Sequence, residues 1–100
     1  MTLPSEVEIF GQSFQVCLSS EMNDEELGRC DYTRQIIFLS KDQAGDSLRD
    51  TLLHEILHAV HWLMGLNDKS TEEEFTARTT TGLRCVMLQN PEVVEYVLGR

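Results

Sequence analysis

The first forty residues alternate apolar and polar side chains with the period of β-strands. "EVEIF" at 6–10 alternates acidic and apolar residues, and "SFQVCL" then places Phe14, Val16 and Leu18 on one face. Successive strand residues point to opposite faces of a sheet, so each run reads as a half-buried strand. The short break that contains Gly11 between the two runs predicts a β-hairpin.

A second hairpin is predicted by "RCDYTRQIIFLS" at 29–40. Residues 31–33 can form its turn, and the four consecutive apolar residues at 36–39 form its second strand. A continuous apolar run indicates a strand that is buried on both faces or that lies beneath a helix. The acidic, polar segment before this hairpin, at 19–28, reads as a loop.

From residue 46 onward the apolar period changes to about 3.6 residues. Asp46 or Ser47 can serve as the N-cap of a helix, and Gly65 provides a C-terminal stop. The pattern predicts one amphipathic helix of about eighteen residues. Its apolar face comprises Leu48, Leu52, Leu53, Ile56, Leu57, Val60, Leu63 and Met64.

Two further helices are expected after the break "NDKST". Ser70 or Thr71 can cap the second helix, which would run to about Gln89. Asn90 precedes a proline and therefore avoids the α region, which ends that helix. Pro91 suits the first position of a short last helix.

These elements fit one α+β domain over residues 1–100. A small antiparallel sheet of hairpins would be followed by a long helix, a second helix and a short C-terminal helix. The chain has 100 residues, of which 41% are hydrophobic, enough for one small core and no second lobe.

The charge of the chain argues against a nucleic-acid-binding protein, because the formal net charge is −9 and only 8 residues are Lys or Arg. The three cysteines form no CxxC pair, which favours free thiols in a reducing compartment. Neither a signal-peptide pattern nor an apolar run of ~20 residues is found. We expect a cytoplasmic protein without nucleic-acid or membrane partners, and the sequence indicates no particular oligomeric state.

The helix predicted at 46–64 contains "HEILH", which consists of His54, Glu55 and His58 around two apolar residues. Residues i and i+4 lie on the same face of a helix, so the two imidazoles can reach one metal ion. Neutral histidine nitrogens bind Zn²⁺ at ~2.0–2.1 Å. Glu55 lies about 100° around the helix, where it can act as general base on a metal-activated water.

A plain buried helix that happens to contain histidines is the alternative to a zinc site, because a five-residue pattern recurs by chance. Three features favour zinc: the strong amphipathic period, the preceding apolar strand, and a glutamate-rich helix start 14 to 16 residues beyond His58. A buried helix would also have to satisfy several polar rings in the core.

Glu72, Glu73 and Glu74 are the candidates for a third zinc ligand, since a catalytic site needs three protein ligands and a water. We take the apolar face of the second helix as centred near Thr79. At ~100° of rotation per residue, Glu72 then lies about 20° from that centre. Glu73 lies about 120° from it, and Glu74 about 140° from it on the opposite side. Glu72 is then in phase with the core, Glu73 lies at its flank, and Glu74 points outward. Helix phase leaves both Glu72 and Glu73 open.

His61 shares the face of His54 and His58, and we interpret it as a second-shell or substrate-facing residue, not a ligand. The longer HExxHxxGxxH pattern is absent. Cys30 could in principle approach the metal as an inhibitory thiolate, but a small buried hydrophobic residue is the more common role.

Over nearly its whole length the chain resembles small phage and prophage zincin-like metallopeptidases. The resemblance rests on "LGRCDYTRQIIFLS", "TLLHEILHAVHWLMGL" and "EEEFTARTTTGL". It implies a minimal gluzincin-like core in which His54 and His58 bind Zn²⁺ and Glu55 is the base. It also favours Glu73 as third ligand, because a Glu-Glu pair precedes the apolar residues of the second helix. The protein would then act in the host cytoplasm.

The expected function is that of a zinc-dependent metallopeptidase with a peptide or protein substrate. The alternative is a non-catalytic zincin-like module of phage origin that binds metal or another protein. By analogy with zincins, the strand "QIIFLS" at 35–40 could bind an extended substrate along a sheet edge.

Overall fold

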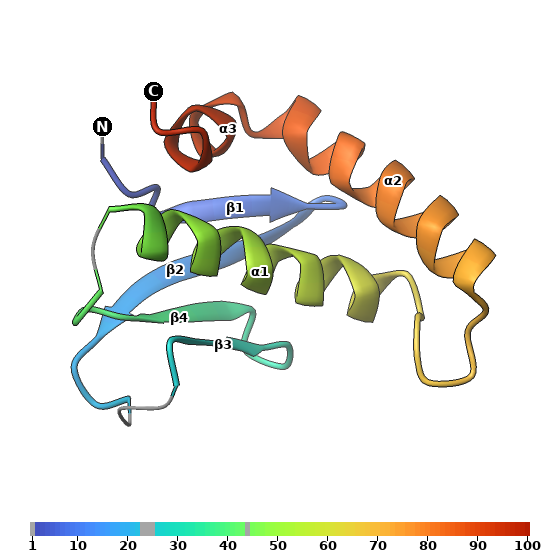
Figure 1. The fold of residues 1–100 in the computed structure, drawn as a ribbon, viewed down its shortest axis with the longest axis horizontal. Helices are drawn as coiled ribbons and strands as arrows, with labels where there is room; N and C mark the ends of the chain where they lie inside the picture. The colour runs from blue at the N-terminus through green and yellow to red at the C-terminus, as the bar shows by residue number, and fades with distance from the viewer. Residues whose placement is uncertain (1, 23–25, 44) are drawn as a thin grey trace.

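A four-stranded sheet followed by three helices forms the described part of the chain, and this confirms the predicted α+β layout (Figure 1). The structure is a computed structural model that describes residues 2–22, 26–43 and 45–100. Its elements are β1 (Glu6–Ile9), β2 (Gln12–Ser19), β3 (Gly28–Asp31), β4 (Ile36–Ser40), α1 (Asp46–Leu63), α2 (Glu72–Gln89) and α3 (Pro91–Val97).

The sheet is mixed, with the strand order β1-β2-β4-β3. Both predicted hairpins are confirmed, since β1 pairs antiparallel with β2 and β3 with β4. The hairpins meet, however, through a parallel pair in which Val16 of β2 lies opposite Ile37 of β4, so a wholly antiparallel sheet was the wrong expectation. The long connection that contains β3 permits this pairing, because parallel strands need a crossover.

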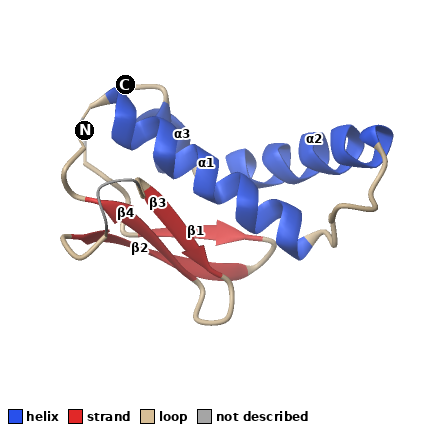
Figure 2. Ribbon diagram, turned by 60° about the horizontal axis from the view of Figure 1, so that its bottom comes forward, coloured by secondary structure: helices blue, strands red, loops and turns tan. Residues whose placement is uncertain are grey.

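The three helices lie on one face of the sheet (Figure 2). α1 packs against β3 and β4, while α2 packs against β1. Ile37 and Leu39 of β4 are fully buried on the helix side, and Ile36 and Phe38 are half-buried on the other side. The continuous apolar run at 36–39 therefore belongs to an interior strand beneath α1, as predicted.

The helix ends match the sequence signals in part. α1 begins at Asp46 with Gly45 as its N-cap (φ 57°), not Asp46 or Ser47; glycine adopts this positive φ without strain. Gly65 follows the end of α1 with φ 72°, as its predicted role as a stop requires. Thr71 caps α2 in a capping box with Glu74. None of the helices in the described residues is long and apolar enough to cross a membrane.

Asn90 fastens the junction of α2 and α3 to β1. Its Oδ1 accepts from the Glu8 N–H at 2.9 Å, and its Nδ2 donates to the carbonyls of Glu8 and Val86, each at 2.8 Å.

Asn90 is 7% exposed, so Asn90→Ala leaves these polar groups without partners. We expect the free energy of unfolding in urea to fall by about 1–3 kcal/mol. Asn67→Ala, at an exposed asparagine, is the control, and an equal loss in both variants would contradict this role.

Candidate metal centre

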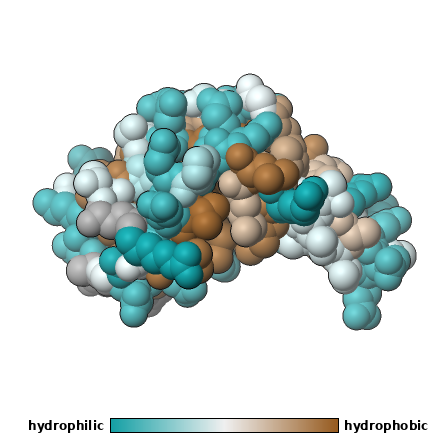
Figure 3. Space-filling view, turned by 90° about the horizontal axis from the view of Figure 1, so that it is seen from above, coloured by the Kyte–Doolittle hydropathy of each residue, from teal (hydrophilic) through white to brown (hydrophobic). Residues whose placement is uncertain are grey.

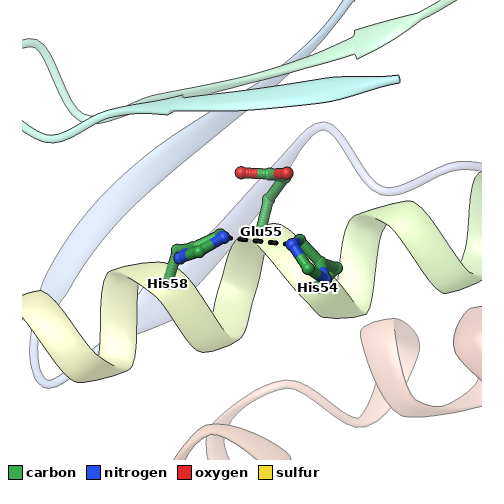
Figure 4. A group of neighbouring side chains, drawn as sticks. All are labelled: His54, Glu55 and His58. Atoms are coloured by element: carbon green, nitrogen blue, oxygen red, sulfur yellow. Dashed lines mark hydrogen bonds between the residues drawn. The ribbon is translucent and has the colours of Figure 1, made fainter. Parts of the chain in front are cut away.

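His54, Glu55 and His58 come together on α1 and offer ligand atoms that all lie within 4.8 Å of one another (Figure 4). The Nε2 atoms of His54 and His58 are 3.0 Å apart, and the two rings meet edge to face with centroids 4.7 Å apart. Both imidazoles are exposed. The i, i+4 spacing thus places two nitrogen ligands at one point on the surface of the helix.

Glu55 differs from the two histidines in being buried, with only 6% of its surface exposed. Its carboxylate points from α1 toward the strands (Figure 4). Burial raises the pKa of Glu55 above its usual value; the nearby His58 and His54 lower it, and Glu26 raises it. A raised pKa makes a carboxylate a stronger base than an ordinary exposed one, which is the direction expected of a general base.

Gly28 of β3 allows the edge of the sheet to approach Glu55 closely. A Cβ atom at this position would lie 2.6 Å from Thr51 Cγ2 and 3.0 Å from Glu55 Oε2. The backbone of β3 therefore occupies space that a side chain would need. This role was not predicted, because the polar pattern at 19–28 indicated that Gly28 belongs to the acidic loop. A glycine at the start of a strand can signal such a close approach.

A cavity of about 350 Å³ opens beside Glu55, between α1 and the segment that leads into β3. His54 and Glu55 line it together, so a candidate ligand and a candidate base face the same space. Its lining also includes the carboxylates of Glu26 and Asp50, which make it acidic. The remaining lining residues are Leu27, Gly28 and Thr51.

A second, apolar cavity of about 160 Å³ lies between α1, α2 and α3 and contains none of the three metal-site residues. Met87 and Leu98, which line it, are 47% and 59% exposed. Seen from above, apolar side chains gather near the middle of the helical face (Figure 3). This cavity holds no polar constellation that could do chemistry.

The three glutamates at the start of α2 are exposed and are not members of the His54–Glu55–His58 group. The first turn of α2 lies beyond the C-terminal end of α1 (Figure 1). The carboxylate of Glu74 accepts the Thr71 N–H at 3.0 Å as part of the capping box. Glu73 as third ligand, with Glu72 or Glu74 as alternatives, stays a prediction.

His61 lies outside the metal-site group and links α1 to α2 instead. Its Nε2 is 2.9 Å from Thr79 Oγ1, and its ring meets Phe75 edge to face with centroids 5.5 Å apart. Burial lowers the pKa of His61, with a smaller contribution from His58. Through these contacts with Thr79 and Phe75, His61 helps to position α2 against α1.

Cys30 also lies outside the group and packs against the hydrophobic core. Burial raises the pKa of its thiol to about 12, with further contributions from the charges of Glu55 and Asp31. Since the thiolate is the form that binds metals, this environment favours the small hydrophobic role over an inhibitory ligand.

The strand at 35–40 was expected to offer a free edge to substrate, and this expectation is wrong. β4 is paired on both sides, with β2 and with β3. The edge strand beside α1 is β3, because the parallel pairing of β2 with β4 pushes β3 outward.

Comparison with protein-family models, with curated proteins and with solved structures finds no match for this chain. The resemblance to phage zincin-like peptidases therefore stays a prediction, and the geometry of His54, Glu55 and His58 is the observation that bears on function.

Proposed function

We propose that this protein is a zinc-dependent metallopeptidase in which His54 and His58 hold the metal and Glu55 is the general base. The convergence of two imidazole Nε2 atoms beside a buried carboxylate carries the proposal. Two nitrogens at ~2.0–2.1 Å from a tetrahedral zinc would lie roughly 3.3 Å apart. The pair is 3.0 Å apart, so zinc fits with little movement of the rings.

Zinc, when bound, would polarise a peptide carbonyl and lower the pKa of a water to about 7. Glu55 would accept the proton of the attacking water and pass it to the departing amine. Its burial keeps the carboxylate away from bulk solvent, and the acidic cavity gives it access to substrate. β3 restricts the carboxylate to the side of α1 that faces this cavity.

Glu73 is the third ligand that we propose, with Glu72 as the alternative. No hydrogen bond or ion pair joins Glu73 to another residue in the described ranges, so no existing contact of its carboxylate would have to break for it to bind a metal. Glu74 would first have to leave the capping box, which costs about 0.5–2 kcal/mol. This cost makes Glu74 the weakest of the three candidates.

A second candidate function is a non-catalytic metal-binding or protein-interaction module. It is supported by the position of Glu72, Glu73 and Glu74 outside the His54–Glu55–His58 group. Two histidines and Glu55 come together without a carboxylate from α2, and a site of this kind can bind a metal without supporting catalysis. Such a module would bind zinc and cleave no peptide, whereas the peptidase does both.

Elemental analysis of protein purified without chelator or nickel affinity resin tests the proposal. We expect about one zinc per chain and a more than tenfold weaker affinity in His58→Ala, since a direct ligand contributes at least as much as the supporting groups around it. His61→Ala is the control, because His61 bonds to Thr79, and its zinc content should not change. A chain without stoichiometric zinc would reject the metal site.

The same measurement on Glu72→Ala, Glu73→Ala and Glu74→Ala identifies the third ligand. We expect only Glu73→Ala to lose zinc, while Glu74→Ala loses stability through its cap. Zinc loss in Glu72→Ala alone would transfer the assignment to Glu72. Full zinc content in all three variants would favour the non-catalytic module.

A further inference from the structure

Tyr32 and Trp62 form a stacked aromatic pair at the surface beside the candidate metal centre. Tyr32 lies in the turn between β3 and β4, and Trp62 lies near the end of α1. Their ring centroids are 4.8 Å apart and their planes are inclined by 15°. Trp62 is nevertheless 59% exposed, so much of its indole ring faces solvent.

Tyr32 follows the end of β3 opposite to the acidic cavity, and Trp62 lies further along α1 than Glu55. Trp62 is one helical turn beyond His58, and Tyr32 directly follows β3, whose Gly28 lines the acidic cavity together with Glu55. Along α1, the seven residues from Glu55 to Trp62 span about 10 Å at ~1.5 Å per residue. An extended peptide advances ~3.3 Å per residue, so this distance corresponds to about three residues.

β3 provides the backbone that such a peptide needs. In the described part of the chain β3 pairs with β4 alone, and its outer edge can add a strand through main-chain hydrogen bonds. The acidic cavity with Glu55 lies at the Gly28 end of β3, and Tyr32 follows its Asp31 end. A peptide along this edge would pass both.

We propose that the Tyr32–Trp62 pair binds an aromatic or large aliphatic side chain of the peptide substrate, about three residues from the scissile bond. The proposal rests on the proposed peptidase function and assigns this site its substrate class. Exposed Trp and Tyr faces contribute strongly to binding through stacking and apolar contact.

A purely structural role for the pair is less consistent with its surroundings. The β3–β4 turn is already closed by Asp31, which accepts from Arg34 N at 3.0 Å and from Arg34 Nε at 2.8 Å. These hydrogen bonds stabilise the turn independently of the two rings. A pair that served only to attach this turn to α1 would not need to leave most of Trp62 in solvent.

Trp62 is the single tryptophan of the chain, so its fluorescence reports binding at this surface directly. The test uses zinc-loaded Glu55→Gln protein, which keeps a bound peptide intact. The probes are end-blocked hexapeptides of Ala, Gly and Ser that carry one Phe, Leu or Lys at each of the six positions in turn. We expect a saturable change in emission, with a Kd about three- to tenfold lower for Phe or Leu at one position than for Ala there.

Tyr32→Ala should abolish this preference, and Tyr32→Phe should keep it. Leu88→Ala is the matched control: Leu88 is 68% exposed, lies on α2 and should leave the preference intact. Equal Kd values for Phe and Ala peptides, a preference for Lys, no saturable change, or a preference that survives in Tyr32→Ala would each overturn the inference. A change in Tm alone in Tyr32→Ala would show a merely structural pair.

The proposed function is measured separately, by zinc content and by hydrolysis with the unmodified chain. A protein that binds zinc and cleaves peptides without an aromatic or aliphatic preference rejects the Tyr32–Trp62 subsite and keeps the peptidase. A protein that shows the preference but cleaves nothing supports a peptide-binding surface and rejects the peptidase.

Discussion

Glu55→Gln is expected to lower kcat/KM for peptide hydrolysis by about 10²–10⁴-fold, the usual contribution of a general base, while the zinc content stays that of the unmodified chain. Glutamine keeps the size of the side chain and its place between α1 and β3, but it cannot accept the proton of the attacking water. His54 and His58 remain to hold the metal. Hydrolysis of a peptide library with mass-spectrometric detection, alongside elemental analysis, measures both quantities.

Asp50→Asn is the matched control for this experiment. Asp50 lies on the same helix and lines the same cavity, but its carboxylate is not in the metal-site group. We expect kcat/KM of Asp50→Asn to stay within a few-fold of the kcat/KM of the unmodified chain. If Glu55→Gln hydrolysed peptides at the unmodified rate, Glu55 would not be the base.

Gly28→Ala should lower hydrolysis by about 10²-fold with zinc still bound. The added Cβ would lie 2.6 Å from Thr51 Cγ2 and 3.0 Å from Glu55 Oε2, so β3 or the Thr51 side chain must move, and the Glu55 carboxylate beside them is displaced as well. A displacement of ~1 Å at a catalytic group can cost about 10²-fold in rate. The two histidines are exposed on α1 and do not depend on this contact, so the metal stays.

Gly82→Ala separates this local effect from a general loss of stability. Gly82 is buried in α2, where a Cβ would lie 2.5 Å from Val60 Cγ1 and 2.9 Å from Met64 Sδ. Overpacking there typically destabilises by about 1–3 kcal/mol without contact to Glu55. We expect Gly82→Ala to lower Tm and keep the kcat/KM of the folded protein. An equal loss of kcat/KM in both variants would show that Gly28 acts only through stability.

Local sequence patterns predicted the helices and both hairpins of the described residues to within a few residues. The 3.6-residue period and Gly65 specify α1, and Thr71 and Pro91 mark the starts of α2 and α3. The i, i+4 spacing of His54 and His58 likewise fixed their convergence before any tertiary contact was considered. Periodicity and spacing are properties of residues that are close in the sequence, so they can be recognised without knowledge of the tertiary structure.

The identity of the edge strand beside the site could not be predicted from local patterns, since strand order depends on pairing between distant segments. The parallel pairing of β2 with β4 places β3 outside and makes Gly28 a neighbour of Glu55. It also brings Tyr32, thirty residues earlier in the chain, against Trp62. No local pattern encodes these contacts, because they join segments that lie far apart in the sequence.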